Sequence, residues 1–302
     1  MIITDFKIAG LIYKLKSDVK IQGLKNDRFQ KFKVKTKNYD IFHTFQNIPQ
    51  IPDSFPPLNK EEKNLLKNCE IFPYFNNTDS PILRFPIIRD QLNDCKNRIN
   101  EITLEIKHSY LSIFDFSHNK IDCFYTNELK SVLKNSRMGS FVFAQFLPNF
   151  SATMIHSSAV IIENKAAVFL APDEGGKTTA AELASGFPIL CDDQNVIRKQ
   201  GNKFITHSTP WGLHIDNSIK ASVGAFFLLE KGKNFKLTLL KPKDLLYYFW
   251  NEHLAYYLYL PKYLKSKHFN FLFNLSNQVP VYKLQFSKDY IDWDAIANLP
   301  YF

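Results

Sequence analysis

The stretch Ala171-Pro-Asp-Glu-Gly-Gly-Lys-Thr-Thr179 decides which fold this chain is expected to adopt. It follows an apolar run at residues 166–170 and precedes a helix-forming run at 178–184, so it should join a buried strand to a helix. In such a loop the backbone N–H groups and the helix N-terminus hold phosphate oxygens. The lysine and threonines that end the stretch indicate ATP as the ligand.

Each residue type in the loop has an expected role toward ATP and Mg²⁺. Lys177 should bridge the β- and γ-phosphates, and the hydroxyl of Thr178 should ligate Mg²⁺. The N–H groups of residues 174–179 should cradle the nucleotide. The predicted nucleotide-binding residues are Ala171, Asp173, Glu174, Gly175, Gly176, Lys177, Thr178 and Thr179.

The loop departs in two ways from the usual pattern G-x-x-x-x-G-K-[ST]. Ala171 stands at the first glycine position, and alanine disfavours the positive φ that glycine adopts cheaply. Asp173 and Glu174 would repel a triphosphate unless they face solvent or a metal. Glycine usage supports the loop, because seven of the ten glycines lie within residues 175–232. Ordinary turn usage in one domain is the alternative explanation for that clustering.

An acidic pair follows the loop. A strand over residues 187–191 should end in Asp192-Asp193, fifteen residues after Lys177. That interval suffices for a short helix and a return to a neighbouring strand at the same sheet edge, where the carboxylates would face the phosphates. Adjacent residues at a strand end point apart, so one carboxylate can bind Mg²⁺ while the other removes a proton from the acceptor. Which one is the base stays open, and a solvated turn is the alternative.

Three segments together resemble the catalytic domain of HPr kinase/phosphorylase, a P-loop fold related to phosphoenolpyruvate carboxykinase. They are Ile155-His-Ser-Ser-Ala-Val160 on a strand predicted over residues 155–162, the loop, and Leu190-Cys-Asp-Asp-Gln-Asn-Val196. The resemblance implies that His156 positions or charge-balances the base, whereas a lone strand histidine is otherwise structural. It implies catalytic roles for Asp192, Asp193, His156 and Lys177, and metal ligation by Thr178, Asp192 and Asp193.

The chain also looks like smaller kinases of this superfamily, some of them encoded beside peptide-modifying systems. This likeness involves residues 208–212 and 225–232. The segment with which HPr kinases grip their protein substrate is not found, so HPr itself is not the expected partner. Pro210, Trp211 and Gly212 are predicted to shape an acceptor pocket, with simple packing as the alternative.

The two halves of the chain differ in pattern. Alternating segments at residues 32–36 and 102–106 and a predicted hairpin over 110–125 indicate β-structure, and a helix predicted over 127–147 leads into the second half. We predict a β-rich α+β accessory or substrate-recognition domain at 1–148. An α/β nucleotide-binding catalytic domain with a mixed sheet, HPr kinase-like, is predicted at 149–302.

Composition excludes several classes of protein. The four cysteines form no C-x-x-C pair, and no signal peptide opens the chain, which favours the cytoplasm. No uncharged apolar run approaches the roughly 20 residues of a membrane span. The net charge of +9 comes from scattered lysines without a nucleic-acid-binding motif. We therefore expect neither nucleic acid nor membrane as a partner, and a homo-oligomer is compatible with the sequence.

These patterns predict an ATP-dependent kinase that phosphorylates a hydroxyl, serine foremost, in a peptide or a small molecule. The alternative is a non-catalytic ATP-binding module that recognises a protein or peptide partner. The tyrosine-rich run at residues 245–260 bears on both functions. A helix there would be apolar almost all round and therefore buried, and a peptide groove is the alternative.

Overall fold

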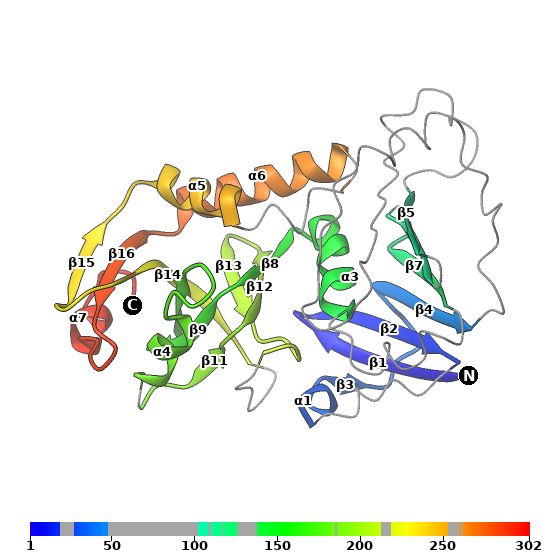
Figure 1. Ribbon diagram of the computed structural model, residues 1–302, viewed down its shortest axis with the longest axis horizontal. Helices are drawn as coiled ribbons and strands as arrows, with labels where there is room; N and C mark the ends of the chain where they lie inside the picture. The colour runs from blue at the N-terminus through cyan, green and yellow to red at the C-terminus, as the bar shows by residue number, and fades with distance from the viewer. Residues whose placement is uncertain are drawn as a thin grey trace.

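The computed structural model describes residues 1–18, 27–47, 102–107, 110–116, 118–125, 138–184, 186–212, 219–252, 260 and 262–302. The chain is a mixed α/β protein built on two mixed β-sheets (Figure 1). The described strands of the first half form one sheet, and those of the second half form the other. The predicted fold class is therefore confirmed at this level, and the more specific kinase fold stays a prediction.

The first sheet has seven strands. The strand pairs β2/β4 and β4/β7 are parallel, and the other pairs are antiparallel. The hairpin predicted over residues 110–125 is confirmed as β6 and β7, with Phe114 opposite Ile121. The strand order of the whole sheet is β3 (Lys33–Val34), β1 (Ile2–Ile8), β2 (Leu11–Ser17), β4 (Ile41–Asn47), β7 (Lys120–Tyr125), β6 (Tyr110–Asp115) and β5 (Ile102–Lys107).

The second sheet carries the loop at residues 171–176. Its parallel centre consists of β10, β14 and β16, and β14 pairs along different parts of its length with three strands. β15 (Lys236–Leu239) pairs with β16 (Val281–Phe286), which lies beside β14. The remaining order is β11 (Ile189–Cys191), β9 (Ser158–Ile162), β10 (Lys165–Leu170), β14 (Lys220–Lys231), β13 (Lys203–His207), β12 (Gln194–Gln200) and β8 (Ala152–His156).

The segment 155–162 is two strands, and the prediction of one strand is wrong. β8 pairs with β12, whereas β9 pairs with β10 and β11, so the chain changes partners at Ser157. Two hydrogen bonds hold this break: Ser157 N donates to Asp193 O (2.9 Å), and Asn195 Nδ2 donates to Ser157 O (2.8 Å). The break places His156 at the end of β8, beside the acidic pair.

The return after the loop also differs from expectation. The helix α4 (Lys177–Glu182) leads to β11, which pairs with β9 and not with β10. β9 therefore lies between the strand before the loop and the strand before the acidic pair. Because both pairings of β9 are antiparallel, β10 and β11 run in the same direction. The prediction that β10 and β11 end at the same edge of the sheet is confirmed. The prediction that these two strands are neighbours is wrong, because β9 lies between them.

Helices and aromatic side chains join the two sheets. Phe143 lies on α3 (Met138–Phe146), the described part of the helix predicted over 127–147. Its ring contacts Tyr13 and Trp211, each at 5.6 Å between centroids. Arg198 Nη1 also donates to Ala9 O at 3.2 Å. The predicted boundary at 148 falls within the 3-10 turn η5 (Leu147–Phe150), and independent folding of residues 149–302 stays a prediction.

The helix α5 (Pro242–Glu252) is buried on one side only. Leu245 and Phe249 are buried, whereas Tyr247 and Trp250 are exposed. The predicted burial of this run therefore holds for one face of the helix and is wrong for the face that carries Tyr247 and Trp250, and residues 253–259 of the run lie outside the described part of the chain. It packs beside α6 (Lys262–Gln278), and α7 (Trp293–Ala297) follows β16. No helix among the described residues is long and apolar enough to cross a bilayer.

Three buried histidines predict a loss of stability in acid. Burial lowers the pKa of His43 and of His268 to about 3, and the pKa of His207 to about 4. Near pH 6.5 the unfolded chain takes up protons at these side chains and the folded chain does not. The free energy of unfolding should therefore fall below about pH 6.5, by at most about 1.4 kcal/mol per pH unit for each histidine, until the folded pKa is reached.

Urea denaturation of the wild type and His268→Gln between about pH 7 and pH 4.5 measures this effect. Glutamine keeps a polar partner for Thr153 Oγ1, which lies 2.9 Å from His268 Nε2. The variant should lose stability less steeply as the pH falls. Equal slopes in the two proteins would contradict this prediction.

Candidate functional site

The loop at residues 171–176 joins β10 to α4. Gly176 precedes the helix with φ 96° and no side-chain cap hydrogen bond. Glu174 also has a positive φ, of 59°, whereas Ala171 is not among the residues with positive φ. Alanine at the first position of the pattern is therefore not strained, because the left-handed turns fall at residues 174 and 176.

The methyl group of Ala171 explains why Gly175 is glycine. A Cβ atom at residue 175 would lie 2.5 Å from Ala171 Cβ and 2.9 Å from Pro172 O. Contacts that short are not tolerated without movement of the backbone. The loop therefore accommodates Ala171 by leaving position 175 without a side chain.

Lys177 lies inside the loop. Its ammonium group is buried and donates to Ala171 O (2.8 Å) and Pro172 O (2.9 Å). Burial lowers the pKa of Lys177, and the carboxylates of Asp173, Asp193 and Glu252 partly offset that effect. The loop thus holds a positive charge against two backbone carbonyls, with three carboxylates near enough to influence it.

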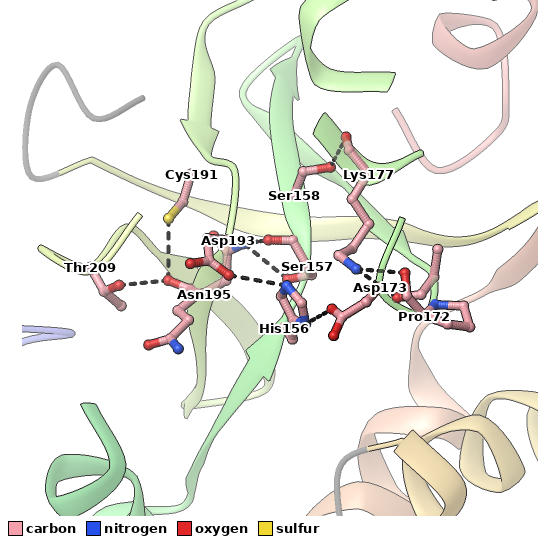
Figure 2. Close-up of polar contacts among 12 residues, drawn as sticks. His156, Ser157, Ser158, Pro172, Asp173, Lys177, Cys191, Asp193, Asn195 and Thr209 are labelled. Carbon is pink, nitrogen blue, oxygen red and sulfur yellow. Dashed lines mark hydrogen bonds and ion pairs between the residues drawn. The ribbon is translucent and has the colours of Figure 1, made fainter. Parts of the chain in front are cut away.

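His156 connects the loop to the acidic pair. Its Nε2 lies 3.0 Å from Asp193 Oδ1, and its Nδ1 lies 3.4 Å from Asp173 Oδ1 (Figure 2). A neutral imidazole can donate to only one of these carboxylates, whereas an imidazolium can donate to both. The residues predicted from three separate segments are therefore brought into one cluster.

The two aspartates of the pair occupy different environments. Asp192 is 3% exposed, whereas the side chain of Asp193 is 18% exposed and contacts His156. The structure thus separates the pair, as the geometry of a strand end predicts. Asp193 is thus the more exposed member of the pair.

A buried hydrogen-bond network holds the backbone around Asp193, and sequence reasoning did not identify it. Asn195 Nδ2 donates to Ser157 Oγ (2.9 Å) as well as to Ser157 O, and Thr209 Oγ1 donates to Gln194 O (2.6 Å). Cys191 Sγ donates to the same carbonyl at 3.2 Å. The only sequence signal for this network is the run of polar residues after Cys191, which is equally typical of a solvated turn.

The C-terminal end of α5 also contributes to the electrostatics of the site. Burial raises the pKa of Tyr248, and the carboxylates of Glu252 and Asp173 raise it further. Glu252 also acts on Lys177. A residue more than seventy positions after the loop therefore influences it, which no local motif could reveal.

The predicted acceptor residues lie at the junction of the two sheets. Trp211 packs edge-on against Phe29 (6.0 Å between ring centroids), and Gly212 O accepts a hydrogen bond from Arg28 Nη1 at 2.8 Å. Pro210 is buried beside them. These contacts are those of packing residues, and an acceptor-binding role for residues 210–212 stays a prediction.

Oxygen donors suited to Mg²⁺ are present around the loop. Thr178 is exposed in the first turn of α4, and Asp193 is accessible. Among the described residues, no group of three or more His, Cys, Asp or Glu side chains is arranged to hold a metal ion. Hydroxyl and carboxylate donors fit Mg²⁺ when nucleotide phosphates and water complete the coordination.

No protein-family model and no curated protein matches the sequence. Among solved structures, the chain is similar to the Hpr(Ser) kinase/phosphatase from Coxiella burnetii. The match covers 45% of this chain and 85% of that chain, with 13% sequence identity and a TM-score of 0.25.

Proposed function

We propose that the chain binds ATP at residues 171–179 and transfers the γ-phosphate to a hydroxyl group of an acceptor. The convergence of Lys177, His156 and Asp193 carries this proposal, because it combines a phosphate anchor with a proton acceptor. The loop contributes Asp173 to the same cluster. A purely structural loop would not require a buried ammonium group within reach of these carboxylates.

Lys177 would exchange its contacts with two loop carbonyls for contacts with the β- and γ-phosphates. A charge-assisted hydrogen bond to phosphate is stronger than one to a neutral carbonyl, so nucleotide binding would favour that exchange. Thr178 and one carboxylate of the acidic pair would hold Mg²⁺. The ion, when bound, neutralises the negative charge that develops on the phosphates.

Asp193 is the proposed general base. As the acceptor oxygen bonds to the γ-phosphorus, the hydroxyl proton passes to Asp193 and the bond to the β-phosphate oxygen breaks, releasing ADP. His156 would hold the Asp193 carboxylate in place through its 3.0 Å contact. The expected acceptor hydroxyl belongs to serine in a peptide or to a small molecule.

A second candidate function is a non-catalytic ATP-binding module that recognises a protein partner. The two carboxylates within the loop favour it, because they would add negative charge beside the phosphate to be transferred. Asp173 is 87% exposed and Glu174 is exposed beside it, so solvent would screen their repulsion and nucleotide binding would be retained. This candidate retains nucleotide binding and omits transfer.

Calorimetric titration of the full chain with ATP, with and without Mg²⁺, tests the proposal. Binding that strengthens with Mg²⁺, followed by slow hydrolysis or transfer to added hydroxyl compounds, is the result expected of a kinase. Binding without any turnover would favour the second candidate. No binding by the folded chain would overturn both.

A further inference from the structure

The helices α5 and α6 lie beside each other along one side of the molecule (Figure 1), and both carry exposed aromatic side chains. Four of these side chains form the surface that we call the aromatic face, and they are between 43% and 69% exposed. Trp250 packs edge-on against Phe269 (6.4 Å between centroids), and Phe269 stacks with Phe273 (6.5 Å). The aromatic face consists of Tyr247, Trp250, Phe269 and Phe273. Large aromatic side chains gathered at a surface are typical of protein-binding sites.

Lysines extend both halves of the aromatic face. Lys243 lies four residues before Tyr247, and Lys265 lies four residues before Phe269, so each shares a helix face with its aromatic neighbour. Both lysines are exposed. Negative charge is scarce here, because α6 contains no acidic residue. The carboxylate of Asp244 accepts a hydrogen bond from Lys241 N (2.9 Å) at the start of α5.

The aromatic face is continuous with the candidate site through α5. Tyr247 and Trp250 lie on one flank of this helix, and Tyr248 and Glu252 lie on the other flank, where the carboxylates of Glu252 and Asp173 both act on Tyr248. Glu252 also acts on Lys177. A chain bound along the aromatic face would therefore lie on the same helix whose other flank acts on the loop.

We propose that the aromatic face docks an acidic peptide segment of the acceptor that carries apolar or aromatic side chains. Apolar side chains of the segment would pack on Trp250 and Phe269, and its carboxylates would pair with Lys243 and Lys265. This inference rests on the proposed function, since it makes the acceptor a peptide or protein and not a free small molecule. The docked segment would bring a neighbouring hydroxyl to Asp193.

Peptide retention on the immobilised full chain tests this proposal without nucleotide, in both the wild-type and Lys177→Ala backgrounds. Three peptide pools serve as probes: Asp/Glu with Phe/Leu/Trp, Lys/Arg with Phe/Leu/Trp, and Asp/Glu with Gly/Ala. The first pool should be retained most strongly. The double variant Trp250→Ala/Phe269→Ala should retain it at least about tenfold less. Tyr290→Ala removes an equally exposed aromatic ring elsewhere and should leave retention unchanged.

Charge reversal provides the second arm. Lys243→Glu/Lys265→Glu should shift the preference from the acidic to the basic aromatic pool, whereas Lys231→Glu/Lys233→Glu, at exposed positions near β15, should not. Circular dichroism melting verifies that each variant folds. Equal retention of the three pools, or retention unaffected by the aromatic variant, would overturn the proposal.

Two further outcomes would replace the peptide by another occupant. Binding to phosphatidylserine vesicles that depends on Trp250 would assign the aromatic face to a membrane surface. Wild-type dimerisation lost in the aromatic variant would assign it to a second copy of the chain. Because retention is measured without ATP, failure of docking is distinct from failure of nucleotide binding. Retained peptides are then assayed as phosphate acceptors.

Discussion

Replacing Lys177 by alanine is expected to reduce ATP affinity about a hundredfold, with the fold preserved. The ammonium group is the buried positive charge inside the loop, and it should contact the β- and γ-phosphates directly. Charged hydrogen bonds contribute about 1.5–3 kcal/mol each, so losing one or two corresponds to that change in the dissociation constant. Calorimetric titration of the variant and the wild type in the presence of Mg²⁺ measures it.

Lys7→Ala is the matched control for this experiment. Lys7 is exposed on β1 of the first sheet, so its removal changes the net charge by the same amount on the sheet that does not carry the loop. The control should bind ATP as the wild type does. Thermal melting of Lys177→Ala is needed as well, because the variant loses two hydrogen bonds to the loop carbonyls. Unchanged ATP affinity in a folded Lys177→Ala chain would rule out residues 171–179 as the nucleotide-binding site.

Replacing Asp193 by asparagine is expected to slow phosphoryl transfer by about 10² to 10⁴-fold while ATP affinity changes only a few-fold. Asparagine keeps the shape of the side chain and a hydrogen bond to His156, but it cannot act as a base toward the hydroxyl proton of the phosphate acceptor. Single-turnover transfer to a known acceptor, or the intrinsic ATPase rate where none is known, gives the comparison. A larger effect on binding than on transfer would assign Asp193 to the metal and not to the base.

Asp192→Asn is the paired variant, because Asp192 is buried where Asp193 is accessible. As the other carboxylate of the pair it is the proposed Mg²⁺ ligand, so the variant should weaken Mg²⁺-dependent ATP binding more than Asp193→Asn does and slow transfer less. Intact transfer in both asparagine variants would exclude a carboxylate base from this pair. Transfer lost only in Asp192→Asn would reverse the assignment of the two residues.

Local sequence signals predicted the loop at 171–176, the helix after it and the common edge of β10 and β11. Each depends on neighbouring residues, such as the apolar run before the loop and the Gly-Gly-Lys-Thr that follows. The chain break at Ser157 could not be predicted in this way. Residues 158–162 continue the apolar pattern of the preceding strand, and the break is held by Asn195, a residue on another strand.

The contribution of α5 to the site could not be predicted from the sequence either, because it also depends on contacts between residues that are far apart along the chain. Tyr248 and Glu252 belong to a run whose composition indicated burial, and only the packing of the chain brings the end of this helix near Asp173. The exposure of Tyr247 and Trp250 depends equally on tertiary structure, since composition does not determine which face of a helix is covered.

The close approach of the Ala171 methyl group to Gly175 has a consequence for the evolution of such loops. The methyl group of one residue fills the volume in which a side chain on the other would lie, so the two positions are epistatic. A larger side chain at residue 175 becomes acceptable only if residue 171 is also changed to glycine and the Pro172 carbonyl moves. A sequence pattern that requires glycine at the position of Ala171 therefore overlooks loops in which glycine at the position of Gly175 leaves space for the alanine methyl group.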